Sequence, residues 1–197
     1  MPLDQTLLKL EVSETGKSRD YWATRPWVSG ETQAAVRSAD IVIVPWEDRG
    51  AEQTPSFPTG TAVLVRQFAK LSDVTVAVGI DRDRYAELAL HANIKRFPMF
   101  FVTAVALPIL TTVIANEIQK ILDDPSPSVV EMEVIVDPQH GKCISVQYKG
   151  PPGDALETLT REIDKCLPRH SEEVQGPQPS AKVPSPKTVP TDEKKAS

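Results

Sequence analysis

Carboxylates follow two apolar segments of the sequence, and they are the side chains best suited to chemistry. Glu47 comes shortly after the apolar run at residues 40–44, and Asp81 and Asp83 follow the run at residues 73–80. Hard divalent cations such as Mg²⁺ and Mn²⁺ prefer carboxylate oxygens as ligands. If the two runs are parallel strands, their carboxyl ends share one edge of a sheet, where ligands usually bind. The three carboxylates could then hold Mg²⁺ or Mn²⁺, and no other cofactor is evident.

Polar and aromatic residues accompany these carboxylates and extend the predicted site. Trp46 and Asp48 flank Glu47, and two arginines alternate with the two aspartates. The segment at residues 58–61 opens a predicted helix, whose backbone N–H groups could bind an anion, although an ordinary capped helix is the simpler interpretation. The predicted ligand-binding residues are Trp46, Glu47, Asp48, Thr59, Gly60, Thr61, Arg82 and Arg84.

The run at residues 79–84, Gly-Ile-Asp-Arg-Asp-Arg, resembles the Asp-x-Asp segment of Toprim domains. Those domains pair this segment with a glutamate from an earlier strand and use a metal ion in phosphodiester chemistry. The resemblance implies a phosphoryl-transfer or nuclease-like enzyme in which Glu47 is that glutamate. Glu47 stands three residues after Val44 and behind a proline, whereas the family has its glutamate directly at the strand end. The alternative, which the pattern favours, makes Asp81 a helix cap and gives the other charges to surface ion pairs.

Other recognisable catalytic and metal-binding motifs are absent from the sequence. The run at residues 11–18 ends like a P-loop, but Glu11 stands where that motif needs a glycine. The histidines and cysteines have no spacing that is typical of ligands or nucleophiles. We therefore expect solvated histidines and reduced, inert thiols. These residues are His91, His140, His170, Cys143 and Cys166.

The composition argues against some partners and favours others. The chain has 197 residues, of which 40% are hydrophobic, and its net charge is −5 at pH 7. Bulk electrostatics give no support to nucleic-acid binding, so we expect a protein partner instead. The first residues lack the basic region and the apolar run of a signal peptide, which predicts a cytoplasmic protein.

Alternating strand and helix patterns predict an α/β fold with three layers. Such alternation favours βαβ units, a mostly parallel sheet and helices on both of its faces. The last two strands would form an antiparallel hairpin across residues 137–141 and extend one edge of the sheet. The predicted strands are residues 6–12, 40–44, 73–80, 100–105, 129–136 and 142–149, and the predicted helices are residues 29–38, 60–71, 81–93, 108–122 and 151–167.

The most apolar segment, residues 97–115, has no charged side chain and allows two interpretations. A stretch of about 19 uncharged residues is near the lower limit for a membrane span. Alternatively, a buried strand ends before Leu107, and a helix begins with Pro108 in its first turn, where the missing N–H of proline is harmless. The polar stripe that starts at Asn116 favours the strand and helix, because a membrane span would gain nothing from it.

Two regions differ in their capacity to fold. Residues 1–168 are predicted to form a single α/β domain, and residues 169–197 a disordered tail rich in proline and lysine. The tail has no aromatic residue and too few apolar ones to offset the entropy of ordering.

Taken together, the patterns favour a noncatalytic α/β module for interaction or regulation, since no catalytic motif has the required spacing. The hairpin edge could add a strand to a partner protein. The alternatives are a metal-dependent, Toprim-like enzyme and a single-pass membrane protein with residues 97–115 as the span.

Overall fold

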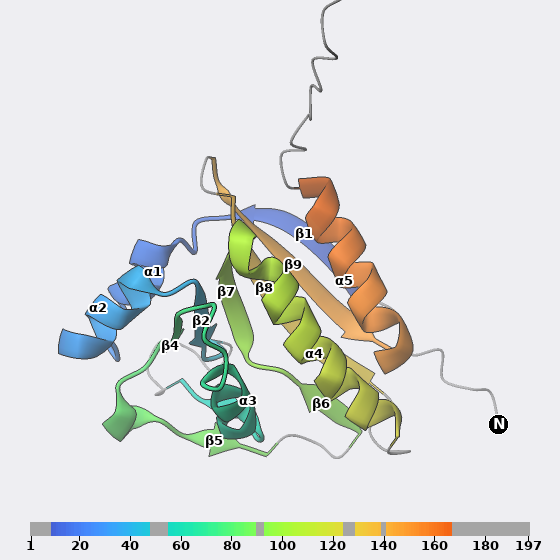
Figure 1. Ribbon diagram of the computed structural model, residues 1–197, viewed down its shortest axis with the longest axis horizontal. Helices are drawn as coiled ribbons and strands as arrows, with labels where there is room; N and C mark the ends of the chain where they lie inside the picture. The colour runs from blue at the N-terminus through green and yellow to red at the C-terminus, as the bar shows by residue number, and fades with distance from the viewer. Residues whose placement is uncertain (1–8, 48–54, 90–92, 124–128, 139–140, 167–197) are drawn as a thin grey trace, which may run out of the picture.

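A mixed β-sheet of seven strands forms the centre of the structure (Figure 1). The computed structural model describes residues 9–47, 55–89, 93–123, 129–138 and 141–166, so the tail predicted at residues 169–197 lies outside the described residues. The strands of the sheet are β1 (Lys9–Thr15), β2 (Ile41–Val44), β4 (Val76–Val78), β6 (Ile94–Arg96), β7 (Met99–Thr103), β8 (Val129–Asp137) and β9 (Cys143–Gly150). Their order is β1-β9-β8-β7-β2-β4, with β6 also paired to β8.

The strand directions differ from the mostly parallel sheet that the sequence predicts. β2 and β4 are parallel, whereas β7 runs antiparallel to β2, with Ile41 opposite Val102 and Val44 opposite Met99. The cause is the connection between β4 and β7, whose described residues contain no α-helix that would carry the chain back along the sheet. The chain therefore re-enters the sheet at the end where it left, and β7 must run in the opposite direction.

The last two strands lie inside the sheet and not at its edge. β8 and β9 pair antiparallel, but β1 pairs with the other side of β9 and β7 with the other side of β8. The amino-terminal strand β1 and the short strand β4 are consequently the two ends of this strand order, and β6 pairs with β8 alone among the described strands.

The prediction of a helix at residues 81–93 is wrong. The chain there forms a 3₁₀ turn, η1 (Arg82–Arg84), and a short strand, β5 (Glu87–Leu88), which pairs with β3 (Phe57–Pro58). The ring of Tyr85 stacks on Phe57 with ring centroids 4.9 Å apart. Tertiary contacts of this kind override the weak helical preference of a charged segment.

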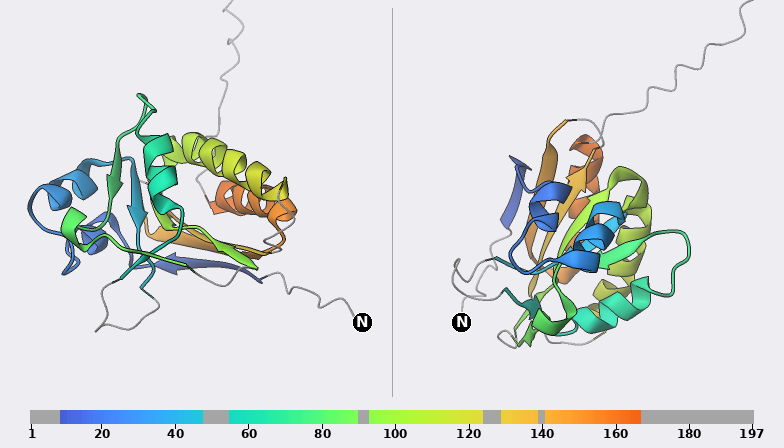
Figure 2. Two further views of the ribbon diagram at one scale, coloured as in Figure 1. Left: turned by 90° about the horizontal axis from the view of Figure 1, so that it is seen from below. Right: turned by 90° about the vertical axis from the view of Figure 1, so that its left-hand side faces the viewer.

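Helices pack on both faces of the sheet. They are α1 (Arg19–Ala23), α2 (Gly30–Ser38), α3 (Thr61–Phe68), α4 (Leu107–Leu122) and α5 (Pro152–Cys166). α1 falls in a segment without a predicted element, whereas α2 and α5 match their predicted ranges closely. Each face of the sheet has its own hydrophobic core, and alternate residues of β2 belong to different cores. Ile41 and Ile43 pack with α3, α4 and α5. Val42 and Val44 pack with α1 and α2 on the other face. Figure 2 shows the two groups of helices on opposite sides of the sheet.

The apolar segment at residues 97–115 is divided as the strand-and-helix interpretation predicts. β7 is followed by the 3₁₀ turn η2 (Ala104–Ala106) and then by α4, with Pro108 in its first turn. By length and composition alone, Ala104–Leu122 is apolar enough to cross a membrane. Its side chains Leu110, Ile114 and Ile118 are buried in the core with the sheet, which is the packing of a core helix.

Candidate binding groove

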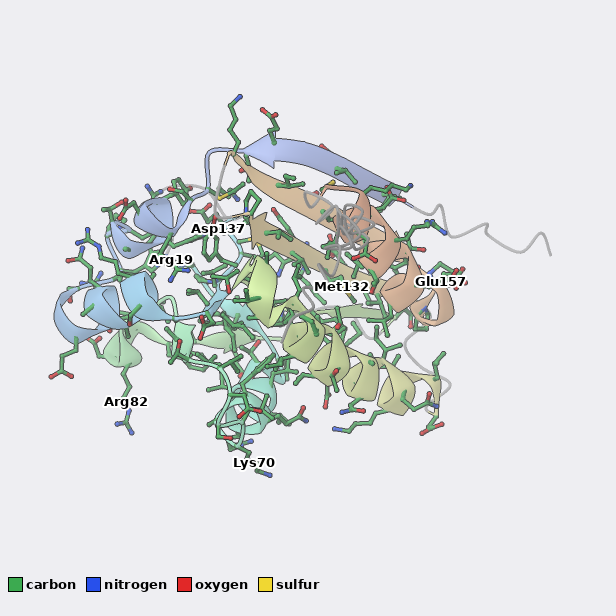
Figure 3. All side chains as sticks on the ribbon, turned by 45° about the horizontal axis from the view of Figure 1, so that its top comes forward. Arg19, Lys70, Arg82, Met132, Asp137 and Glu157 are labelled. Atoms are coloured by element: carbon green, nitrogen blue, oxygen red, sulfur yellow. The ribbon has the colours of Figure 1, made fainter. Side chains whose placement is uncertain are left out.

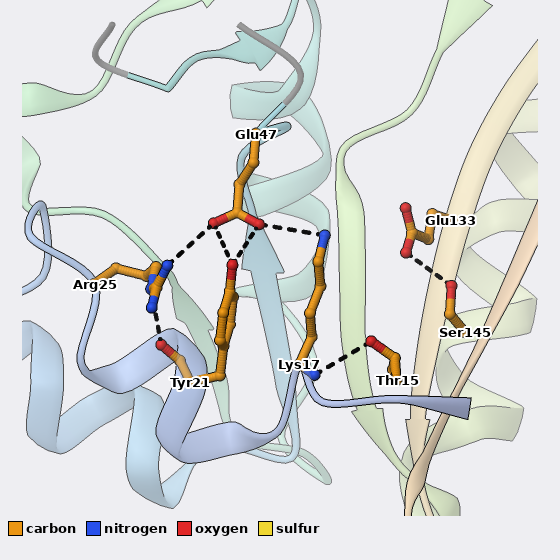
Figure 4. Close-up of polar contacts among 7 residues, drawn as sticks. All are labelled: Thr15, Lys17, Tyr21, Arg25, Glu47, Glu133 and Ser145. Atoms are coloured by element: carbon orange, nitrogen blue, oxygen red, sulfur yellow. Dashed lines mark hydrogen bonds and ion pairs between the residues drawn. The ribbon is translucent and has the colours of Figure 1, made fainter. Parts of the chain in front are cut away.

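Glu47, the predicted glutamate of the metal site, is held by three side chains of the chain itself (Figure 4). The Tyr21 hydroxyl donates to the carboxylate at 2.8 Å, Lys17 Nζ lies at 3.2 Å and a guanidinium nitrogen of Arg25 at 3.7 Å. We call Lys17, Tyr21, Arg25 and Glu47 the Glu47 clasp. Burial and the hydrogen bond to Glu47 raise the pKa of Tyr21 above its ordinary value. The clasp connects α1 and the segments beside it to the end of β2.

Asp81 serves the start of α2. Its carboxylate accepts the Ser29 hydroxyl at 2.7 Å and the Ser29 backbone N–H at 3.0 Å, and these bonds lower the pKa of Asp81. Asp83 is exposed in η1, and Arg84 donates to the carbonyl of Pro26 at 2.9 Å. The helix that Asp81 was predicted to cap is absent from the described part of that segment, and the Asp81 carboxylate binds Ser29 at the start of α2, far away in the sequence.

The metal hypothesis gains no support from these contacts. Glu47 and Asp81 have different partners, and the described residues contain no group of three His, Cys, Asp or Glu that could hold a metal ion. Asp48 and the three histidines lie outside the described residues. Both cysteines are free thiols, and Cys143 is buried.

The start of α3 does bind an anion, but the anion belongs to the chain. The Glu87 carboxylate accepts the backbone N–H of Gly60 at 2.9 Å and that of Ala62 at 2.6 Å, and also the Tyr85 hydroxyl at 2.6 Å. Gly60 has a φ of 95°, a left-handed conformation that favours glycine. Although burial opposes the shift, the hydrogen bonds hold the pKa of Glu87 below its ordinary value. The predicted anion site is therefore already filled.

The remaining residues of the predicted site have structural partners. Trp46 Nε1 donates to the carbonyl of Phe97 at 2.7 Å, and the Arg96 guanidinium lies 4.3 Å from the Trp46 ring centroid. The Thr61 hydroxyl is buried and donates to the carbonyl of Pro58, and the Thr59 N–H donates to Leu88. Among the predicted ligand-binding residues that the structure describes, Arg82 alone lines the groove described next.

A groove with a volume of 710 Å³ runs along β4 at the edge of the sheet. Figure 2 (left) shows β4 between α2 and α3. Residues of these two helices form the two walls of the groove. The walls contribute Glu31, Thr32, Ala35, Ala62, Val65 and Arg66. The floor and the end at η1 contribute Val76, Ala77, Val78, Ile80, Arg82 and Tyr85. These residues define the β4 groove, which is mainly apolar.

The floor of the β4 groove carries backbone groups that no strand pairs. β4 is the last strand of the sheet, and in the described part of the chain only β2 pairs with it. The Thr75 carbonyl and the Gly79 N–H bind Ile41 and Ile43 of β2, at 3.1 and 2.8 Å. Since backbone groups alternate in direction along a strand, Val76 and Val78 direct their N–H and C=O groups away from β2.

Most residues of the β4 groove were not predicted from the sequence, because the position of the groove depends on which strand is last in the sheet. In α3, for example, Val63 is exposed, whereas Val65 lines the groove. The available signal was Val-Ala-Val in β4, a run without charge.

Comparison of the chain with protein families, with curated proteins and with solved structures found no match.

Proposed function

We propose that this protein is a noncatalytic interaction module that binds an extended segment of a partner protein in the β4 groove. The observation that carries the proposal is the free edge of β4 at the floor of an apolar groove between α2 and α3. An extended peptide that adds a strand to a free sheet edge gains main-chain hydrogen bonds, and pockets for alternate side chains supply specificity.

The backbone of β4 fits this role. The N–H and C=O groups of Val76 and Val78 face away from β2 and are available to a new strand. At about 3.3 Å per residue, a strand of this length pairs with a segment of roughly three to five residues. The binding segment is therefore short.

The two walls of the groove supply the side-chain contacts. Successive side chains of an added strand point to opposite faces of the sheet. One set meets Thr32 and Ala35 of α2, and the other meets Ala62 and Val65 of α3. Small and apolar residues on both walls favour a segment with apolar side chains on each face.

The edge strands of the sheet differ in a way that selects β4. In many proteins, charged side chains on an edge strand prevent it from pairing with a strand of another chain. The strand at the other end of the order, β1, exposes Lys9, Glu11 and Glu14, and β6 carries a lysine and an arginine. In contrast, β4 consists of Val, Ala and Val. The uncharged edge is the one suited to strand addition.

A selection experiment tests the proposal. Immobilised full-length protein is used to select binders from a random library of displayed peptides, and their affinities are measured by fluorescence polarisation. We expect short extended sequences whose binding weakens at least about tenfold in Ala35→Trp, because the indole occupies the space of the bound chain. Ala34→Trp is the matched control, since Ala34 is exposed on the same helix and does not line the groove.

A second variant probes the backbone contact. Val78→Pro removes an N–H that faces the groove and leaves the bonds between β4 and β2 in place, and proline is tolerated at sheet edges. The variant should keep the wild-type melting temperature within a few degrees and lose peptide binding. Recovery of no peptide, or of peptides that bind Ala35→Trp and Val78→Pro like the wild type, would refute the proposal.

A further inference from the structure

We infer that the partner segment carries an acidic side chain that binds the arginines of the β4 groove, an inference that rests on the proposed function. The groove is lined by two arginines and one glutamate, Arg66, Arg82 and Glu31, so its lining is positive. The chain as a whole has a net charge of −5. A positive groove in an acidic protein selects an acidic ligand by charge complementarity.

The two arginines are free to bind a ligand. Both are exposed, and among the described residues neither guanidinium forms a hydrogen bond or an ion pair. In Figure 3, the Arg82 side chain extends from η1 away from the rest of the structure. Guanidinium groups bind carboxylates with two parallel hydrogen bonds, which fixes the geometry of the contact as well as its charge. An acidic residue beside apolar ones therefore matches the groove better than a neutral segment.

The position of the charges also orients the segment. Arg66 stands on the α3 wall, whereas Glu31 stands on the α2 wall. Because alternate residues of an added strand point to opposite walls, the acidic side chain should point toward α3. The residues that point toward α2 should lack negative charge, since Glu31 would repel it.

A second copy of the chain fits the groove poorly. In a pair of β4 edges, the α2 and α3 walls of one copy would meet those of the other, and the arginines of both copies would come together. The groove is therefore suited to one extended chain, and its occupant is a segment of another protein.

The experiment uses peptides selected against the full-length protein. For each binder, a version with Asp or Glu replaced by Asn or Gln is compared with the original peptide. We expect the acidic peptide to bind the wild type about fivefold more tightly, the strength of an exposed ion pair, and the preference to fall as salt is added. Arg66→Gln and Arg82→Gln should each reduce the preference. Lys70→Gln, which removes an exposed positive charge beyond α3, should leave it unchanged.

The outcomes separate this inference from the proposed function. Neutral or basic selected peptides that still lose binding in Ala35→Trp would overturn the acidic specificity and leave the interaction module in place. Failure to select any peptide would overturn both. Dimerisation that Val78→Pro abolishes would assign the groove to a second copy, and tighter peptide binding after removal of residues 169–197 would assign it to the chain's own tail. Either result would overturn the inference.

Discussion

The Tyr21 hydroxyl lies 2.8 Å from both carboxylate oxygens of Glu47, so one phenol donor serves the whole carboxylate. Lys17 and Arg25 add positive charge beside the same group. The Glu47 side chain is about 20% exposed, which makes the clasp partly shielded from water. The geometry gives Glu47 the role of holding α1 against the end of β2.

Replacement of Tyr21 by Phe should lower the free energy of unfolding by about 1–2 kcal/mol, because a partly buried carboxylate loses a hydrogen-bond donor. Urea denaturation followed by circular dichroism measures the change. Ser38→Ala is a suitable control, since its hydroxyl is exposed and binds only carbonyls of its own helix. An unchanged midpoint in Tyr21→Phe would mean that the clasp contributes nothing to stability.

The same clasp predicts how the protein responds to divalent cations. Millimolar Mg²⁺ or Mn²⁺ should leave the melting temperature of the wild type unchanged, because Glu47 is already bound by cationic and phenolic groups. Differential scanning fluorimetry checks this expectation. A rise in melting temperature that Glu47→Gln abolishes would instead support the metal-dependent enzyme.

Glu87 should make the stability of the fold depend on pH in the acid range. Its pKa is held below the ordinary value in the folded state, despite the opposing effect of burial. The carboxylate therefore contributes stability above the pKa of the unfolded chain, about 4.3, and the contribution is lost as the pH falls through the lower folded pKa. Glu87→Gln should cost about 1 kcal/mol at neutral pH and flatten this acid-range loss. Denaturant midpoints measured across the acid range give both quantities.

Glu157→Gln is the control for this experiment, because Glu157 is exposed on α5 and the substitution removes the same charge (Figure 3). Its acid-range stability profile should keep the slope of the wild type. A slope in Glu87→Gln equal to that of Glu157→Gln would remove Glu87 from the account of acid sensitivity.

Truncation on the buried side of α4 should be costly. Ile114 is 2% exposed and packs in the core with the sheet, whereas Val105 in η2 is 69% exposed. Ile114→Ala should lower the free energy of unfolding by about 2–5 kcal/mol, through lost burial and the cavity left behind. Val105→Ala should change it by less than about 0.5 kcal/mol. Denaturation in detergent-free buffer makes the comparison, and equal effects of the two changes would contradict a core position for α4.

The local patterns of the sequence predict much of the secondary structure. The periodicity of residues 151–167 and the break at Pro108 each reflect contacts within one element, so they can be read from neighbouring residues. The prediction of a helix at residues 81–93 is wrong because the structure of this segment is determined by contacts with residues far away in the sequence. Tyr85 contacts Phe57, and Glu87 contacts Gly60 and Ala62.

The predicted site fails for a related reason. The strands before Glu47 and Asp81, β2 and β4, are parallel as the site requires. Each carboxylate is nevertheless bound by a partner from elsewhere in the chain, Glu47 by Tyr21 and Asp81 by Ser29. The partners of Glu47 come from α1 and the segments beside it, where the sequence carries no sign that Tyr21 would face a carboxylate. The β4 groove depends on sheet order, which is a property of the whole chain.

The cap of α3 comes from a strand that follows it in the chain. α3 has eight residues, too few for a helix to persist by itself in water. During synthesis, α3 leaves the ribosome before Glu87, so its first turn stays open until the later segment arrives. The helix, β3 and β5 therefore gain order together, and in hydrogen exchange their amides should open as one cooperative unit.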